Sequence, residues 1–275
     1  EYLTTPDGNG YTAATIAAAK EQVDVLTILK KLNTKYLTIP DRYGYTAATK
    51  AAIKGQLYIL EILNDLNQEY LTTPDGNGYT AATIAAEKGQ IGILEKLHKL
   101  NQEYLTTPDG NGYTAVTIAA LKGQVASLHK LYNLKPEYLT TPDRYGYTAA
   151  TIAAERGDVV TLENLHYLNH EYLTTPDRNG YTAATEAALR GDVDTLEKLQ
   201  DLNQEYLTTS DRHGHTAATY AAFIGDVAIL KKLHELKPKY LTIPDGNGYT
   251  AATIAAAKEQ VDVLTTLKKL NTKYL

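Results

Sequence analysis

Apolar residues form two helical patterns within each stretch of about 34 residues. In residues 75–108 the first pattern is two double alanines and the second is a row of large aliphatic residues; these are Ala81, Ala82, Ala85 and Ala86, then Ile91, Leu94, Leu97 and Leu100. Spacings of three and four place such residues on one side of a helix, so each pattern predicts one. The alanines leave the first helix thin, which lets neighbouring helices approach closely.

Turn and cap residues separate the two patterns. Residues 74–78, Pro-Asp-Gly-Asn-Gly, predict a tight hairpin-like turn, in which Gly78 suits a positive φ. Thr80 is suited to cap the first helix, and Gly89 to end it. Gln90 precedes the second helix and is replaced in later units by aspartate, a good N-cap, at Asp158, Asp192 and Asp226.

The whole unit repeats. The tyrosine of the phrase Tyr-Leu-Thr recurs every 34 residues, at Tyr2, Tyr36, Tyr70, Tyr104, Tyr138, Tyr172, Tyr206, Tyr240 and Tyr274. A second ladder runs through Tyr11, Tyr45, Tyr79, Tyr113, Tyr147, Tyr181 and Tyr249, interrupted by His215. These ladders explain why 22 tyrosines stand against one phenylalanine, Phe223. We expect the first ladder to form a partly buried column, with hydroxyls reaching water or backbone and Leu3 and its equivalents packed beside it.

The repeat predicts a single solenoid over residues 1–275, since stacked units share one continuous core. The expected units are 7–40, 41–74, 75–108, 109–142, 143–176, 177–210, 211–244 and 245–275, with residues 1–6 completing a preceding unit.

A period of 34 also occurs in tetratricopeptide repeats, but those have two longer helices and no such hairpin. The aspartate, the glycine three residues later, the threonine, the paired alanines, the closing glycine and the leucine-rich second helix resemble ankyrin repeats instead. The resemblance covers the whole chain. It implies an all-α ankyrin-repeat solenoid, elongated and curved, whose helix-turn-helix units are joined by hairpin-like turns. Two departures are the segment Thr80 to Thr83, Thr-Ala-Ala-Thr in place of the family's Thr-Pro-Leu-His, and one extra residue per unit.

Composition and charge exclude several classes of functional site and disfavour some classes of partner. The chain has no cysteine or methionine, which excludes disulfides, thiolate metal sites and a cysteine nucleophile. Its net charge of -5 disfavours nucleic-acid binding through counterion release. No apolar stretch has the length of a membrane helix and Glu1 begins no signal-peptide pattern, so we expect a soluble chain without membrane insertion; its location is undetermined.

Several motifs resemble catalytic or ligand sites but fit structural roles better. The hairpin resembles part of a calcium loop, yet Ile84 stands where the bidentate carboxylate is required. It also echoes a dinucleotide fingerprint, but no apolar strand precedes it. His98, His166 and His234 share one repeat position and lie two repeats apart. Stacked helices then separate them by roughly 20 Å, too far to share a metal ion, and we expect surface histidines. No catalytic, metal or cofactor site is expected.

Two Arg-Gly-Asp tripeptides, 156–158 and 190–192, match a cell-adhesion sequence. In both, the glycine is placed to end one helix and the aspartate to cap the next. The structural roles are therefore preferred over adhesion.

Arginine positions suggest a partner-binding surface. All six arginines lie either after the hairpin aspartate or before the glycine that closes the first helix. By the resemblance to ankyrin repeats, these positions line the concave groove that binds partners, and arginine and tyrosine are enriched in such interfaces. The predicted partner-binding residues are Arg42, Tyr43, Tyr45, Arg144, Tyr145, Tyr147, Arg156, Arg178, Asn179, Tyr181, Arg190, Arg212, His213, His215, Tyr220 and Phe223. Drift of exposed turn residues is the competing interpretation.

The leading functional hypothesis is a non-catalytic scaffold that binds a protein of unknown identity along this groove. The alternative is a structural array, a spacer or filament segment with no dedicated ligand. Residues 7–37 and 245–275 differ only at Ile28 and Thr266, and neither terminal unit looks capped. The sequence therefore leaves open a part of a longer array, a designed array, or a segment that self-associates end to end into a superhelix.

Overall fold

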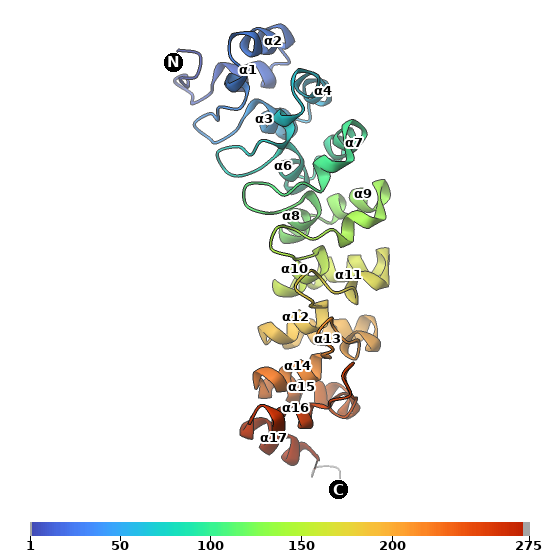
Figure 1. The fold of residues 1–275 in the computed structure, drawn as a ribbon. Coiled ribbons are helices and arrows are strands. Elements are labelled where there is room, and N and C mark those ends of the chain that lie inside the picture. The colour runs from blue at the N-terminus through green and yellow to red at the C-terminus, as the bar shows by residue number, and fades with distance from the viewer. Residues whose placement is uncertain (1, 272–275) are drawn as a thin grey trace. The chain divides into compact units, whose positions relative to one another are not determined.

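The computed structural model describes residues 2–271, and every regular element in them is an α-helix or a short 3-10 helix. The prediction of an all-helical solenoid of hairpin-linked helix pairs is confirmed (Figure 1). The chain divides into two compact units, unit 1 (Glu1–Tyr145) and unit 2 (Gly146–Leu275), which are described separately.

Unit 1 contains four helix pairs, each followed by a short turn of helix that holds the Tyr-Leu phrase. The elements are α1 (Ala13–Ala19), α2 (Val23–Leu32), η1 (Thr34–Leu37), α3 (Ala47–Lys54), α4 (Leu57–Leu66), α5 (Glu69–Thr72), α6 (Ala81–Glu87), α7 (Ile91–Leu100), η2 (Gln102–Leu105), α8 (Ala115–Leu121), α9 (Val125–Leu134) and η3 (Pro136–Thr140). The first helices pack on one another in one layer and the second helices in another, while the hairpins project beyond the first layer (Figure 1).

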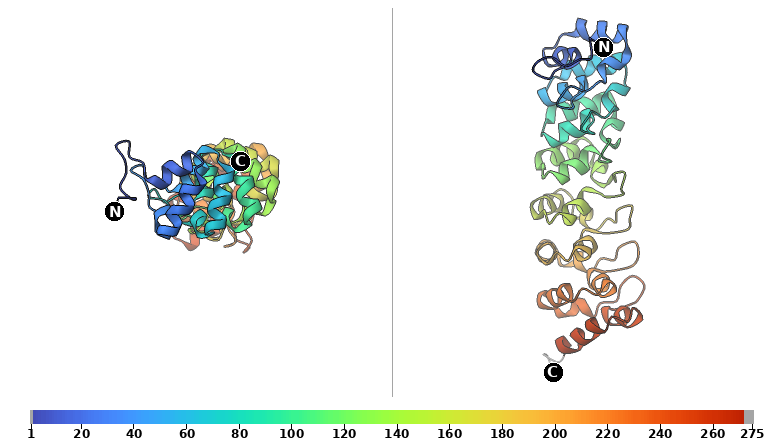
Figure 2. Two further views of the ribbon diagram at one scale, coloured as in Figure 1. Left: turned by 90° about the horizontal axis from the view of Figure 1, so that it is seen from above. Right: turned by 90° about the vertical axis from the view of Figure 1, so that its left-hand side faces the viewer.

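Unit 2 repeats this arrangement. Its elements are α10 (Ala149–Glu155), α11 (Val159–Leu168), η4 (His170–Leu173), α12 (Ala183–Arg190), α13 (Val193–Leu202), η5 (Gln204–Leu207), α14 (Ala217–Ile224), α15 (Val227–Leu236), η6 (Pro238–Leu241), α16 (Ala251–Ala257) and α17 (Val261–Asn271). Its hairpins project on one side of the stacked helices in the right-hand view of Figure 2.

Paired threonines start every first helix. The Thr83 amide donates to Thr80 Oγ1 at 3.3 Å, and the Thr80 amide donates back to Thr83 Oγ1 at 3.0 Å. This reciprocal capping box satisfies two amides that the helix itself leaves without partners. It explains why the segment Thr-Ala-Ala-Thr begins a helix although it departs from the ankyrin pattern.

The aliphatic rows and the first tyrosine ladder form the core. Leu94 and Leu97 are fully buried, as are their equivalents in the neighbouring pairs. From Tyr70 to Tyr240 the ladder tyrosines are buried. Several of their hydroxyls donate to backbone carbonyls, as from Tyr70 to Thr34 at 3.0 Å, whereas the Tyr104 hydroxyl donates to Asn64 Oδ1 at 2.6 Å. The predicted column is confirmed for these residues. Tyr2 is exposed, and Tyr274 lies outside the described residues.

The prediction of surface histidines is wrong for the shared repeat position. His98 and His166 are half-buried and His234 is buried. Nδ1 of His98 lies 2.8 Å from the Tyr138 hydroxyl, and Nδ1 of His166 lies 2.6 Å from that of Tyr206. Each hydroxyl also bonds a backbone carbonyl, Tyr138 to Gln102 at 3.3 Å and Tyr206 to His170 at 3.2 Å. These histidines therefore support the tyrosine column, and burial lowers the pKa of His98.

Gly89 and Gly92 give opposite predictions although they lie three residues apart. Gly89 has φ of 66°, and a Cβ there would meet nothing closer than 3.5 Å, so only the left-handed backbone opposes a side chain. Gly92 lies inside α7, where a Cβ would meet Leu57 at 3.9 Å. We expect Gly89→Ala to lower the free energy of unfolding by about 1 kcal/mol and Gly92→Ala to raise it by about 0.5–1 kcal/mol.

Chemical denaturation of the two variants beside the parent chain measures both effects. A Gly89→Ala protein as stable as the parent would show that the turn after α6 tolerates another conformation.

Candidate functional site

The surface that the sequence predicts to bind a partner is formed by the hairpins and by the adjoining exposed side of the first helices. We call it the hairpin face. Within a hairpin, Asp75 Oδ1 accepts the amides of Asn77 at 2.9 Å and Tyr79 at 3.0 Å, and the Gly78 amide donates to the Asp75 carbonyl. The buried aspartate thus fixes the shape of the turn.

Successive hairpins are joined through their backbones. In unit 1 the amide after each hairpin aspartate donates to the glycine carbonyl of the hairpin before it: Arg42 to Gly10, Gly76 to Gly44, Gly110 to Gly78 and Arg144 to Gly112, at 2.7–2.9 Å. Unit 2 has the same bonds, from Arg178 to Gly146, Arg212 to Gly180 and Gly246 to Gly214. We call this series the hairpin ladder.

Tip side chains add a second bond to the hairpin ladder. Asn77 Nδ2 donates to the Tyr43 carbonyl at 2.8 Å, and the same position holds Tyr43, Tyr145 and His213 in other hairpins. Each of these reaches the tip carbonyl before it: the Tyr43 hydroxyl bonds Asn9 at 2.9 Å, the Tyr145 hydroxyl bonds Asn111 at 3.0 Å, and His213 Nε2 bonds Asn179 at 2.8 Å. Much of the tip variation therefore preserves one structural role.

Two hairpin arginines also contribute to the ladder. Arg144 Nη2 donates to the Asp109 carbonyl and Arg212 Nη1 to the Arg178 carbonyl, both at 3.1 Å. Both guanidinium groups belong to exposed residues, as do those of Arg42 and Arg178.

Unit 2 carries a continuous set of rings on the hairpin face. We call Tyr181, His213, His215, Tyr220 and Phe223 the aromatic strip. Tyr181 contacts His213 and Tyr220, each with 5.7 Å between ring centroids. His215 lies 5.8 Å from Tyr220 and 5.4 Å from Phe223. The strip thus runs from a hairpin tip to the end of α14.

The two tyrosines of the strip meet through their hydroxyl groups. The Tyr220 hydroxyl lies 3.4 Å from that of Tyr181, and burial together with this contact raises the pKa of Tyr220. At the open end of the strip the ammonium of Lys258 lies 4.5 Å from the centre of the Phe223 ring, within cation–π range.

In unit 1 the hairpin face holds a buried cation. The Lys50 ammonium lies 4.4 Å from the Tyr11 ring centre and 5.2 Å from that of Tyr45. Burial lowers the pKa of Lys50, while Asp41 opposes that effect. The predicted residue Tyr45 thus belongs to a lysine site that the prediction did not include.

Unit 2 has an ion-pair cluster on the same face. Arg190 Nε lies 3.0 Å from Glu186 Oε1, and its Nη2 lies 2.5 Å from Glu155 Oε1. Glu186 is 0% exposed, and burial raises the pKa of its carboxyl group. Arg156 is exposed beside this cluster, and half-buried Tyr147 is close enough for Glu186 and Glu155 to help raise its pKa. Two carboxylates thus hold one guanidinium in place.

Three functional candidates share one repeat position, and the sequence reasoning used only one of them. The position is isoleucine in five repeats, but it is Lys50, Glu186 and Tyr220 in the others. Comparing the first helices position by position would have found them. A polar side chain at a position that normally buries an isoleucine lowers the stability of the fold. Such exceptions are expected at functional sites.

The sixteen predicted residues are distributed over both units. Arg42, Tyr43, Tyr45, Arg144 and Tyr145 belong to unit 1, and the other eleven to unit 2. The Arg-Gly-Asp segments have a structural role, because each aspartate caps a second helix. Asp158 Oδ1 accepts the Thr161 amide and Asp192 Oδ1 accepts the Thr195 amide, both at 3.0 Å.

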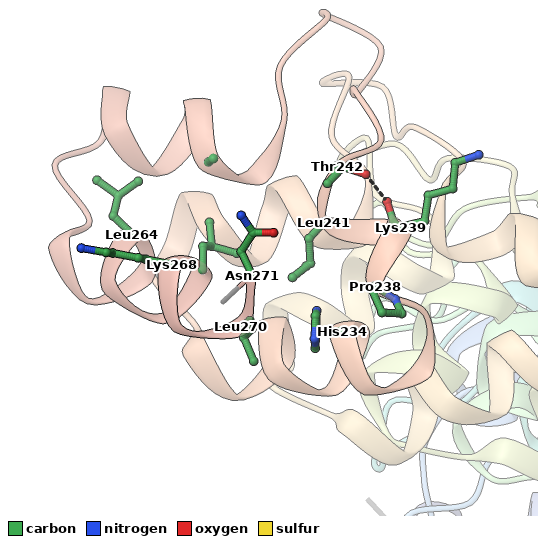
Figure 3. A pocket seen from close by; sticks show the side chains of 11 residues that line it. His234, Pro238, Lys239, Leu241, Thr242, Leu264, Lys268, Leu270 and Asn271 are labelled. Atoms are coloured by element: carbon green, nitrogen blue, oxygen red, sulfur yellow. Dashed lines mark hydrogen bonds between the residues drawn. The ribbon is translucent and has the colours of Figure 1, made fainter. Parts of the chain in front are cut away.

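Unit 2 has a cavity of about 690 Å³ between α15, η6, α16 and α17 (Figure 3). His234, Pro238 and Leu241 line it from one helix pair and Leu264 and Asn271 from the next. In earlier repeats the equivalents of His234 and Pro238 surround a ladder tyrosine, as His98 and Gln102 surround Tyr138. The cavity therefore belongs to the tyrosine column.

Metal-binding clusters and membrane-spanning helices are both absent from residues 2–271. No group of three histidine or acidic side chains is placed there to hold a metal ion. None of the helices in this part of the chain has the length and hydrophobicity needed to cross a membrane.

The buried carboxyl group of Glu186 predicts a stabilising substitution. We expect Glu186→Ile to raise the free energy of unfolding by about 1 kcal/mol or more at neutral pH, since replacing a buried charge by a packed aliphatic residue is often stabilising. The folded-state pKa is raised, so Glu186 is least costly below its unfolded pKa and most costly above its folded pKa. The gain should therefore shrink as the pH falls toward 4.

Urea unfolding at neutral and acid pH checks this. Ile152→Glu places the same carboxyl group in the preceding repeat and should destabilise the chain. Equal gains from Glu186→Ile at both pH values would contradict the role of charge burial.

Comparisons with known proteins agree with this architecture. No known protein-family model matches the chain, and no curated protein matches its sequence. A solved structure that is similar is that of the ankyrin repeat domain of Bcl-3, described as a unique member of the IkappaB protein family. The two share 18% identity and a TM-score of 0.57, over 82% of this chain and 99% of that one. With its hairpins, paired helices and closing glycines, this chain has the fold of an ankyrin-repeat protein.

Proposed function

We propose that this protein is a non-catalytic scaffold that binds a protein partner along the hairpin face, within an array of the eight predicted repeats. The observation that carries the proposal is the exposed apolar surface beside the aromatic strip. Phe223 and Ile224 at the end of α14 are each 37% exposed, and Leu189 at the end of α12 is 36% exposed. Exposed apolar side chains that gather on one face are typical of interaction sites.

The hairpin ladder separates binding candidates from structural residues. Tyr43, Tyr145 and His213 already have a structural role, so their variation alone does not support binding. Phe223 contributes no bond to the hairpin ladder, and Arg156 is exposed at the end of α10. Aromatic and arginine side chains of this kind dominate the binding energy of interfaces.

A second candidate function is end-to-end association, as a spacer or filament segment. The supporting observation is apolar exposure on outer helices. Ile28 and Leu32 of α2 are 54% and 61% exposed, and Val261 of α17 is 67% exposed. Val25 of α2 is partly exposed, whereas its equivalents Ile59 and Ile93 are fully buried by neighbouring repeats. A second copy could cover these side chains as a neighbouring repeat does.

A photocrosslinking amino acid at position 223 should capture the partner of the scaffold in an extract of the source cells. The matched control is position 167, because Tyr167 is exposed on the second helix α11 and lies away from the hairpin face. The captured protein is then purified, and its affinity for the parent chain, Phe223→Ala and Tyr167→Ala is measured by calorimetry.

We expect Phe223→Ala to weaken binding by about tenfold or more, as for a hot-spot aromatic, and Tyr167→Ala to leave it unchanged. Equal affinities for all three chains would place the interface elsewhere.

End-to-end association predicts a molar mass that rises with concentration. Light scattering of the parent chain should show this rise, and the double variant Ile28→Glu/Leu32→Glu should abolish it by charging the exposed side of α2. Tyr58→Glu, a charge placed at another exposed position of unit 1, is the control and should still associate. A parent chain that stays monomeric at high concentration would contradict this function.

A further inference from the structure

We propose that the hairpin face of unit 2 binds an acidic peptide segment, with carboxylates on Arg178, Arg212 and Lys258 and an apolar side chain on the aromatic strip between them. This inference rests on the proposed scaffold function and assigns a chemical class to the partner.

The first step is the pair of arginines on adjacent hairpins. Arg212 Nη1 donates to the Arg178 carbonyl at 3.1 Å, so the two residues lie on successive steps of the hairpin ladder. This bond uses one donor of Arg212 and leaves the rest of its guanidinium fork available. A planar fork matches a carboxylate with two parallel hydrogen bonds, which a lysine cannot reproduce.

The second step is the state of the neighbouring carboxylates. Asp177 and Asp211 are buried, and Oδ1 of each accepts an amide of its own hairpin, from Tyr181 at 3.1 Å and His213 at 2.8 Å. Burial also raises the pKa of Asp177. The charges that these hairpins expose to solvent are therefore the two guanidinium groups, which are complementary to an acidic segment.

The third step is the surface that joins the cations. His213 follows Arg212 at the hairpin tip and contacts Tyr181, which contacts Tyr220, and the centroids of Tyr220 and Phe223 lie 6.1 Å apart. Lys258 closes the other end of the strip by its contact with Phe223. Rings bracketed by cations fit an extended segment with acidic residues on both sides of an aromatic or aliphatic residue.

Other charged groups near the strip do not reverse this pattern. Glu186, in the first turn of α12, and Glu155, at the end of α10, are both bound to Arg190. His215 Nδ1 faces the buried Asp245 carboxylate at 3.5 Å. These three carboxylates are held by groups of the chain itself and do not neutralise the exposed guanidinium groups of Arg178 and Arg212. Glu259 is exposed next to Lys258, so the positive charge is concentrated at the arginine end of the strip.

The test uses three fluorescein-labelled capped pentapeptides that share a central phenylalanine, flanked on each side by two glutamates, two glutamines or two lysines. Fluorescence polarisation with the full chain should show the acidic peptide binding about tenfold tighter than the neutral one, with the advantage falling as salt is added. The lysine peptide should bind most weakly.

Variants assign the binding to the site. Arg178→Gln/Arg212→Gln should abolish the preference for the acidic peptide, and Arg178→Lys/Arg212→Lys should restore it only in part. Arg42→Gln changes the same repeat position in unit 1 and should have no effect. Circular dichroism verifies that each variant keeps its helices.

Tighter binding of the neutral or lysine peptide, or equal losses with Arg42→Gln, would overturn the acidic-segment proposal. The scaffold function would still stand if position 223 captures a partner in the crosslinking experiment. Failure of both experiments would reject both proposals.

Discussion

The hydrogen bond from each hairpin amide to the glycine carbonyl of the hairpin before it is the constraint on which the other features of this surface depend. At 2.7–2.9 Å it brings the backbones of successive hairpins into direct contact. A Cβ at Gly44 would lie 2.3 Å from Asn77 Nδ2, so a side chain there would displace the tip asparagine, and the positive φ of 88° disfavours it as well. Because every hairpin is fixed to its neighbour, the first helices beneath are held at one spacing, which the small alanines between them allow.

This constraint divides the residues of the hairpin face into two groups. The tip position must reach the carbonyl of the preceding tip, and asparagine, tyrosine and histidine do so with quite different side chains. The variety of residue types at the tip position is compatible with the hairpin ladder, so this variety carries little information about a partner. Positions on the first helix contribute no bond to the ladder, so a change there alters the surface without breaking the connection between hairpins. The rings of Tyr220 and Phe223 and the ion pair of Glu186 all belong to this second group.

Much of the fold could be predicted from the sequence because its signals are local and recur. The threonine caps, the glycines that end the first helices and the spacing of Leu94 and Leu97 each act within a few residues, and repetition removes the ambiguity of any single copy. The roles of the histidines and of the tip tyrosines could not be predicted, because their partners lie 34 to 40 residues away. The hairpin position and residue type of Tyr43 favour binding, whereas its hydroxyl has a structural bond to Asn9. Lys50 and Glu186 lie on first helices rather than in hairpins, and the arginine pattern does not point to them.

The repeat architecture also explains how a buried charge can persist in this chain. Glu186 occupies a position where isoleucine serves five other repeats, and it is fully buried. In a globular core a polar group of this kind perturbs the packing of the whole domain. In a stack of repeats, stability is close to a sum of local terms, so the cost falls on one repeat and its nearest neighbours. The same reasoning applies to Lys50 between its two tyrosines. Each repeat can thus carry a less stable but distinctive side chain on the hairpin face, while the repeats on either side keep the common pattern and maintain the fold.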